Sequence, residues 1–189
     1  MCVCIVNENY YFVTGLPRSR TAWLANWLTA PGTFCFHDAT LIDNSHVGVL
    51  SVMAERQNRR QYEAVGDSDS GLIFWSGQVR AACPKSPFIL IERDPEACLA
   101  SSLRLGFSKG LWDAILQAYW QTRRLPGVRI VSYDSLDDID VLDSLYYDCT
   151  GLPMDRQRTE LLQHLNVQEI LNNGWPSVKG APELHVQSA

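Results

Sequence analysis

The chain has 189 residues, of which 46% are hydrophobic and 20% charged, and its formal net charge is −5. This length favours one domain spanning residues 1–189, and the acidic balance argues against a nucleic-acid partner. No apolar run approaches the roughly 18–20 residues of a membrane span. Residues 1–9 lack the regions of a signal peptide, so we expect a cytoplasmic protein without a membrane partner. The six scattered cysteines lack zinc-binding spacing, which favours reduced thiols and no metal.

A strand, a tight turn and a helix open the chain. The apolar run 10–13 predicts a buried strand, and Gly15 and Pro17 mark the loop that follows it. The next helix carries its apolar residues on one face, at Trp23, Leu24, Trp27 and Leu28. Helix N-termini bind anions through free amides and the helix dipole. The residues at this terminus add two cations and two hydroxyls, from Arg18, Ser19, Arg20 and Thr21.

Strands and helices alternate along the rest of the chain. We expect further strands at 34–36, 62–65, 87–92 and 128–133, and helices at 46–61, 95–105, 111–124, 134–150 and 155–171. Segment 66–71 has the composition of a loop, 72–82 favours a helix, and the tail 172–189 is predicted to be irregular. This order indicates a three-layer α/β fold with a central, mainly parallel sheet, similar to P-loop NTPases. The loops after Val13, Ile91 and Tyr133 should share one crevice.

The first loop does not satisfy the P-loop motif itself. That motif reads G-x-x-x-x-G-K-[ST]. Counted from Gly15, the second glycine position holds Arg20 and the lysine position holds Thr21. The nearest cation, Arg18, lies inside the loop, which weakens a kinase or ATPase interpretation.

Three segments instead resemble sulfotransferases that use 3′-phosphoadenosine-5′-phosphosulfate (PAPS). Residues 15–23 read Gly-Leu-Pro-Arg-Ser-Arg-Thr-Ala-Trp, similar to the family's 5′-phosphosulfate loop, G-x-P-[RK]-S-G-T-[TS]-[WL]. Arg93 and Ser101 have the spacing of the family's R-[ND]-P-x-[DE]-x-x-x-S segment, although the acid, Glu96, stands directly after the proline. Residues 130–136 resemble a strand that ends in Tyr-Glu-Asp-Leu. The chain is similar to a short bacterial or phage-type member.

The resemblance implies a role for each matching position. Backbone amides from Arg18 to Ala22 would hold the 5′-phosphosulfate, and Arg18 would stabilise charge on the bridging oxygen. Hydroxyls of Ser19 and Thr21 would donate to phosphate and sulfate oxygens. The cofactor-binding set is Gly15, Pro17, Arg18, Ser19, Arg20, Thr21, Ala22, Trp23, Arg93, Ser101 and Tyr133.

Several of these positions carry open alternatives. Arg93 and Ser101 match the residues that hold the 3′-phosphate, and Tyr133 matches a tyrosine near the adenine. Trp23 matches an aromatic that stacks on adenine, or it packs in the core. Arg20 replaces the family glycine. It adopts a positive φ at a steric cost, adds a cation beside the phosphosulfate, or points to solvent.

Sulfuryl transfer also needs a base. In the tyrosylprotein branch of the family a Glu-Glu pair follows the first helix and a short strand, and His37-Asp38 falls at the matching place. The ordinary pKa of histidine suits neutral pH better, which favours His37. Asp38 then orients His37 or is itself the base, and the alternative is that His37 is an ordinary loop histidine.

The resemblance therefore predicts transfer of a sulfuryl group from PAPS to a hydroxyl or amine of a small-molecule or carbohydrate acceptor, leaving adenosine 3′,5′-bisphosphate. The chemistry requires no metal, because the anion loop and the arginines supply positive charge. A small-molecule or nucleotide kinase on the same architecture, and a catalytically inactive nucleotide-binding relative, are the alternatives.

Overall fold

A five-stranded sheet forms the centre of the molecule. The computed structural model describes residues 9–60, 62–104 and 106–164, and within them the strand order is β2-β3-β1-β4-β5. All four pairings are parallel, which confirms the predicted α/β class. The strands are β1 (Tyr10–Gly15), β2 (Thr33–His37), β3 (Ala64–Ser68), β4 (Phe88–Glu92) and β5 (Val128–Ser132).

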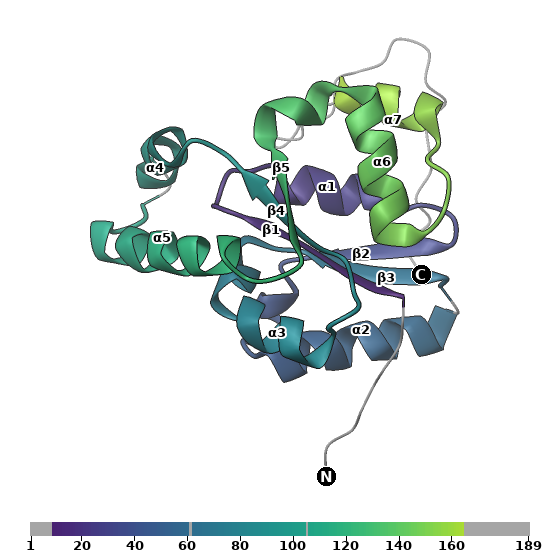
Figure 1. Cartoon of the computed structure of the whole chain (residues 1–189), viewed down its shortest axis with the longest axis horizontal. Helices are drawn as coiled ribbons and strands as arrows, with labels where there is room; N and C mark the ends of the chain where they lie inside the picture. The colour runs from purple at the N-terminus through teal and green to yellow at the C-terminus, as the bar shows by residue number, and fades with distance from the viewer. Residues whose placement is uncertain (1–8, 61, 105, 165–189) are drawn as a thin grey trace, which may run out of the picture.

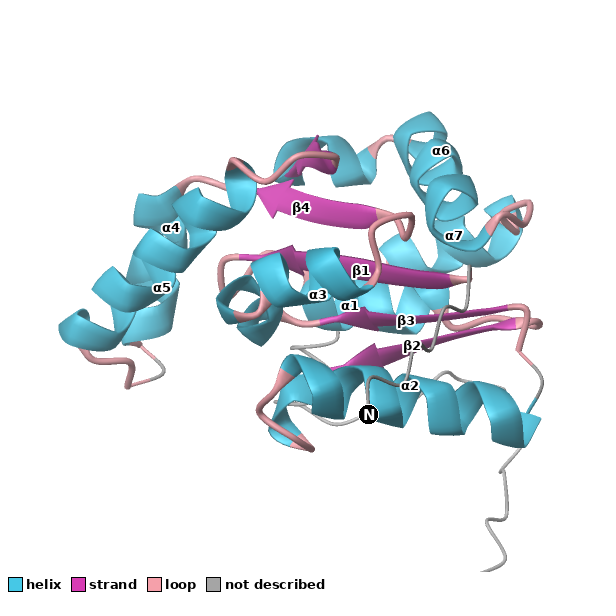
Figure 2. Ribbon diagram, turned by 60° about the horizontal axis from the view of Figure 1, so that its bottom comes forward, coloured by secondary structure: helices cyan, strands magenta, loops and turns pink. Residues whose placement is uncertain are grey.

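Helices cover both faces of the sheet (Figures 1 and 2). On one face lie α1 (Thr21–Leu28), α6 (Ile139–Thr150) and α7 (Arg156–Gln163), and on the other lie α2 (His46–Arg60) and α3 (Ser76–Ala82). The pair α4 (Pro95–Leu103) and α5 (Lys109–Arg123) follows β4. Three short 3-10 turns complete the described chain, namely η1 (Ala39–Leu41), η2 (Ser70–Phe74) and η3 (Tyr133–Asp137).

Strand β1 is buried on both sides because its side chains alternate between two cores. Tyr11 and Val13 pack with α1 and α6, whereas Tyr10 and Phe12 pack with α2 and α3. All four side chains are at most 1% exposed. Burial of one such apolar side chain contributes about 1.5–3 kcal/mol to stability, so the strand that precedes the candidate anion loop is firmly held.

The third strand corrects one prediction. Gly66, Asp67 and Ser68 lie inside β3 and are buried, although the composition of 66–71 predicted a loop. Glycine is needed at 66 because a Cβ there would lie 2.0 Å from Cε2 of Tyr11. The polar residues of this strand are tolerated because they have partners at the end of the sheet. A prediction from local composition does not take such tertiary partners into account.

The other predicted elements are confirmed with shifted ends. Segment 72–82 divides into η2 and α3, and 134–150 divides into η3 and α6. The last helix is described only as far as Gln163, and the predicted irregular tail 172–189 lies outside the described residues. None of the helices described has the length and apolar composition that crossing a bilayer demands.

The order of the strands creates one crevice. The chain leaves β1 toward β2 and β3 on one side, whereas β4 pairs with β1 on its other side. The connections that follow β1 and β4 therefore diverge above the carboxyl ends of neighbouring strands. In open α/β sheets this switch point is where ligands bind.

Candidate functional site

The loop between β1 and α1 is strained and tightly packed. Arg18 and Arg20 have φ of 76° and 62°, in the left-handed region that costs an L-residue about 1–2 kcal/mol. At Gly15, an added Cβ would lie 2.9 Å from the Ile91 carbonyl oxygen and 3.1 Å from Cβ of Ser19. Strain of this kind gathers at functional sites. Within the described chain, the remaining non-glycine residue with positive φ is Asp38.

The first turn of α1 has the features expected of a candidate anion site. Arg20 is the N-cap residue, and its side chain makes no capping hydrogen bond. The amide of Ser19 is used inside the loop, where it donates to the carbonyl oxygen of Leu16 at 3.1 Å. The Ser19 amide is therefore engaged within the loop, and the other amides of the predicted run, Arg18 to Ala22, stay candidates for holding an anion.

Two side chains for which the sequence predicted cofactor contacts, Ser19 and Trp23, pack within the protein. The Ser19 side chain is fully buried, and its contact with phosphate or sulfate oxygens stays a prediction. Trp23 stacks on Trp27, with ring centroids 5.6 Å apart, and its indole N–H donates to the carbonyl oxygen of Leu162 at 3.0 Å. Core packing, the alternative left open by the sequence, is what the structure shows for Trp23.

The loops after β1 and β4 meet through two arginines and a serine. Arg18 Nε donates to Ser101 Oγ at 3.0 Å, and Arg93 Nη1 donates to the carbonyl oxygen of Arg18. Ser101 stands in the second turn of α4, which begins with Pro95 and is capped by the Asp94 side chain. This helix brings the hydroxyl back to the loop after β1, so Arg18, Arg93 and Ser101 meet at the carboxyl ends of β1 and β4.

Tyr133 closes the crevice on the β5 side. The guanidinium carbon of Arg93 lies 4.0 Å from the centroid of the Tyr133 ring, and that of Arg20 lies 4.9 Å from it. Nη1 of Arg20 also lies 2.6 Å from Asp137 Oδ1. The Arg20 side chain is therefore turned away from the start of α1 and toward η3. Of the alternatives for Arg20, the positive φ is confirmed. Its side chain contacts Tyr133 and Asp137, so it does not point into solvent alone.

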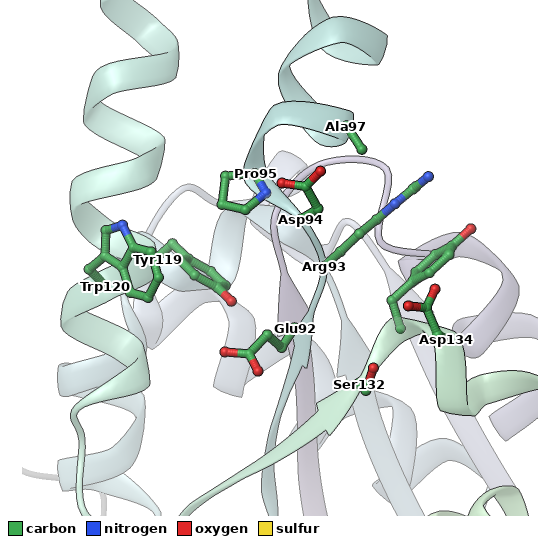
Figure 3. A pocket seen from close by; sticks show the side chains of 10 residues that line it. Glu92, Arg93, Asp94, Pro95, Ala97, Tyr119, Trp120, Ser132 and Asp134 are labelled. Carbon is green, nitrogen blue, oxygen red and sulfur yellow. The ribbon is translucent and has the colours of Figure 1, made fainter.

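A cavity of about 450 Å³ opens beside Arg93. Figure 3 shows Arg93 extending along its rim, with Tyr119 and Trp120 of α5 on the opposite side and Glu92 pointing toward Tyr119. Arg123 binds Glu92 at 2.8 Å, and burial raises the pKa of Tyr119 to about 12. The lining residues are Glu92, Arg93, Asp94, Pro95, Ala97, Tyr119, Trp120, Ser132, Tyr133 and Asp134.

His37 and Asp38 lie close together at the end of β2. His37 Nδ1 lies 2.9 Å from the carbonyl oxygen of Ser68, and Nε2 lies 3.2 Å from Asp38 Oδ2. A carbonyl oxygen only accepts, so Nδ1 carries the proton and neutral His37 has its lone pair on Nε2. Burial raises the pKa of Asp38, while His37 opposes this rise and Asp69 adds to it.

Ser68 connects this pair to the anion loop. Its carbonyl oxygen accepts from His37, and its hydroxyl donates to the carbonyl oxygen of Thr21 at 2.9 Å. Thr21 is the first residue of α1. One buried serine therefore joins the candidate base to the candidate phosphate-binding helix.

Two further carboxyl groups, Asp67 and Asp69, lie in the segment 66–71, whose composition predicted a turn or a rim of the acceptor pocket. Asp69 accepts from the Gly71 amide at 2.6 Å and from the Thr40 amide at 3.1 Å, which fastens η1 to η2. Asp67 is fully buried, and burial raises its pKa well above the usual range.

Comparison with known proteins supports the fold. No protein-family model and no curated protein sequence matches this chain. The structure is similar to the crystal structure of a sulfotransferase from Alicyclobacillus acidocaldarius, with a TM-score of 0.54 and 15% sequence identity over 80% of this chain and 85% of that one. The chain therefore has a three-layer α/β fold that resembles the fold of a sulfotransferase.

Proposed function

We propose that this protein is a sulfotransferase that moves a sulfuryl group from PAPS to a hydroxyl or amine acceptor. The observation that carries the proposal is the meeting of Arg18, Ser101 and Arg93 above the switch point of the sheet. Each residue matches a position that holds one end of a doubly phosphorylated nucleotide in the family that the sequence resembles. The similar fold of a sulfotransferase structure supports the same interpretation.

The residues present fit a nucleotide with two separate anionic groups. The N-cap residue of α1 makes no capping hydrogen bond through its side chain. At the base of the loop, Gly15 lies so close to the Ile91 carbonyl oxygen that a side chain does not fit there. Arg93 would hold the 3′-phosphate with Ser101, because a guanidinium binds phosphate through two parallel hydrogen bonds. The cavity beside Arg93 and Tyr133 offers room for the nucleoside.

The chemistry divides between the two halves of the crevice. Bound PAPS would supply the sulfuryl group. Arg18 would stabilise the charge that develops on the phosphate oxygen as its bond to sulfur breaks. The acceptor oxygen or nitrogen forms the new bond to sulfur, and its proton passes to the His37–Asp38 pair. Ser68 holds His37 in the tautomer whose Nε2 can accept.

Ligand-induced stabilisation tests the proposal directly. Adenosine 3′,5′-bisphosphate, AMP and ATP would be compared for their effect on the thermal unfolding temperature. A ligand at about 100 times its Kd stabilises by about 2.7 kcal/mol, or roughly 5–10 °C for a chain of this size. We expect that shift for the bisphosphate alone, and we expect Arg93→Ala to abolish it.

Arg124→Ala is the matched control, because Arg124 is an exposed arginine at the end of α5. It should leave the shift unchanged. Equal stabilisation by AMP and the bisphosphate would contradict a two-phosphate site. Stabilisation by ATP with Mg²⁺ alone would favour a kinase, and PAPS binding without transfer to a broad set of acceptors would favour an inactive relative.

A further inference from the structure

Arg18 and Arg93 have assigned roles in the proposed function, whereas the part that Arg20 plays is still open. Arg20 and Arg93 both lie over the ring of Tyr133, at 4.9 and 4.0 Å from its centroid. Arg93 in turn donates to the backbone of Arg18. Arg20 therefore lies beside the same ring as the arginine assigned to the 3′-phosphate.

The backbone gives no reason for an arginine at position 20. The residue has a φ of 62°, which favours glycine. It is also the N-cap of α1, where side chains that accept hydrogen bonds are preferred, and arginine only donates. The interactions that Arg20 makes through its guanidinium are those with Tyr133 and Asp137.

Another anion can easily replace Asp137 as the partner of Arg20. The Arg20 side chain is 33% exposed and the Asp137 side chain is 71% exposed, so water competes for both groups and the pair is weak. A nucleotide phosphate carries more charge than a carboxylate and presents three acceptor oxygens. A phosphate held beside Arg93 would therefore be a stronger partner for the Arg20 guanidinium than Asp137 is.

We propose that Arg20 is a further ligand of the nucleotide 3′-phosphate, held by Asp137 beside Tyr133 until the phosphate bound to Arg93 replaces that carboxylate. The inference rests on the proposed function, because Arg93 is assigned to the 3′-phosphate there. It explains why an arginine occupies a left-handed position in the loop. It also assigns a role to Asp137, whose carboxylate competes with the nucleotide.

Calorimetric titration of the full chain with adenosine 3′,5′-bisphosphate and with AMP tests this assignment. Arg20→Gln removes the charge and keeps a side chain of similar reach. It should weaken bisphosphate binding about tenfold, as expected for one charge-assisted hydrogen bond, and change AMP binding less than about twofold. Asp137→Asn frees Arg20 and should tighten bisphosphate binding. Arg59→Gln, at an exposed arginine paired with Glu55 on α2, is the control and should change neither Kd.

Arg20→Gly separates a binding role from a backbone effect. Glycine accepts the left-handed conformation without strain, so this variant should unfold at a higher temperature while losing as much bisphosphate affinity as Arg20→Gln. Unchanged bisphosphate affinity in both Arg20 variants overturns the inference, and so does unchanged affinity in Asp137→Asn. Equal weakening of AMP and bisphosphate binding would place the contact at the 5′-phosphate and overturn it as well.

Failure of the proposed function has a different signature. In that case the wild-type chain binds the bisphosphate no better than AMP, and Arg93→Ala has no effect. If the wild type prefers the bisphosphate, and Arg93→Ala removes that preference, the proposed function stands whatever the Arg20 variants do.

Discussion

Arg18 Nε donates a hydrogen bond to Ser101 Oγ at 3.0 Å, although 83 residues separate the two in sequence. One residue belongs to the loop after β1, and the other to the second turn of the helix after β4. Their contact shows that two segments, each predicted separately to bind an anion, meet at one place in the fold. The contact also places a hydroxyl against the arginine proposed for the sulfuryl end.

Ser101→Ala should therefore act on the nucleotide that has a 3′-phosphate. Loss of one hydrogen bond to a charged group predicts a three- to tenfold weaker Kd for adenosine 3′,5′-bisphosphate, or about 1 kcal/mol, with little change for AMP. Titration calorimetry measures both. The neighbouring Ser102 is the control, since its buried hydroxyl has no hydrogen-bond partner in the described chain. If Ser102→Ala weakens binding as much as Ser101→Ala, the effect is one of helix packing.

Gly15→Ala should destabilise the fold. The new methyl group would meet the Ile91 carbonyl oxygen at 2.9 Å and the Ser19 Cβ at 3.1 Å, and overpacking of this kind costs about 1–3 kcal/mol. Urea unfolding at pH 7 measures the loss. Gly77→Ala in α3, where an added Cβ meets nothing within 4 Å, should leave stability unchanged or slightly raised. Equal stability of the two variants would mean that the loop adjusts freely.

Asp67 should make stability decrease as pH rises. Burial raises the pKa of its carboxyl group well above the usual range, so the folded chain binds a proton that the unfolded chain releases. Its contribution is complete below the ordinary pKa of an aspartate, near 4, and is lost as pH rises toward the folded value.

Asp67→Asn should remove that slope. The amide resembles the protonated carboxyl, so the variant should gain stability over the wild type progressively as pH rises above about 4, measured by urea unfolding. Asp113→Asn on the exposed face of α5 is the control, and its free energy of unfolding should change with pH as that of the wild type does. A wild-type slope that survives in Asp67→Asn would refute this account of Asp67.

Variants of the His37–Asp38 pair should lose catalysis and keep nucleotide binding. General-base catalysis contributes about 10²–10⁴-fold, so single-turnover sulfuryl transfer should slow by that factor in His37→Ala and Asp38→Asn, while the Kd of the bisphosphate changes less than about twofold. Transfer at the wild-type rate in both variants would exclude this pair as the base.

The pH profile of His37→Ala then distinguishes the two groups. His37 opposes the rise in the pKa of Asp38, so its removal raises that pKa further. If Asp38 is the base, the residual activity of His37→Ala requires a higher pH than the wild type does, because the carboxyl group must be deprotonated. If His37 is the base, the pH profile of the residual activity of His37→Ala shows no fall at low pH that follows the protonation of Asp38.

Local patterns identified most of the elements. The apolar run of β1, the glycine and proline of its loop and the helical spacing of α1 all agree with the structure. The predicted loop at 66–71 failed because polarity was taken as exposure, whereas Asp67 and Ser68 are buried against partners from other segments. For Trp23, the match to a motif position did not reveal its neighbours in the fold. Trp27 stacks on its ring, and the Leu162 carbonyl oxygen accepts from its indole N–H.

The amino-acid order alone determined that an anion loop precedes a helix, that Arg93 and Ser101 follow a buried strand, and that strands alternate with helices. Spacing along one segment suffices for these features, because backbone periodicity relates only near neighbours. The tertiary structure decided that Arg18 meets Ser101, that Arg20 turns to Asp137, and that Ser68 joins His37 to Thr21. These contacts depend on which strands lie side by side, and that order is set by packing of the whole core rather than by any single segment.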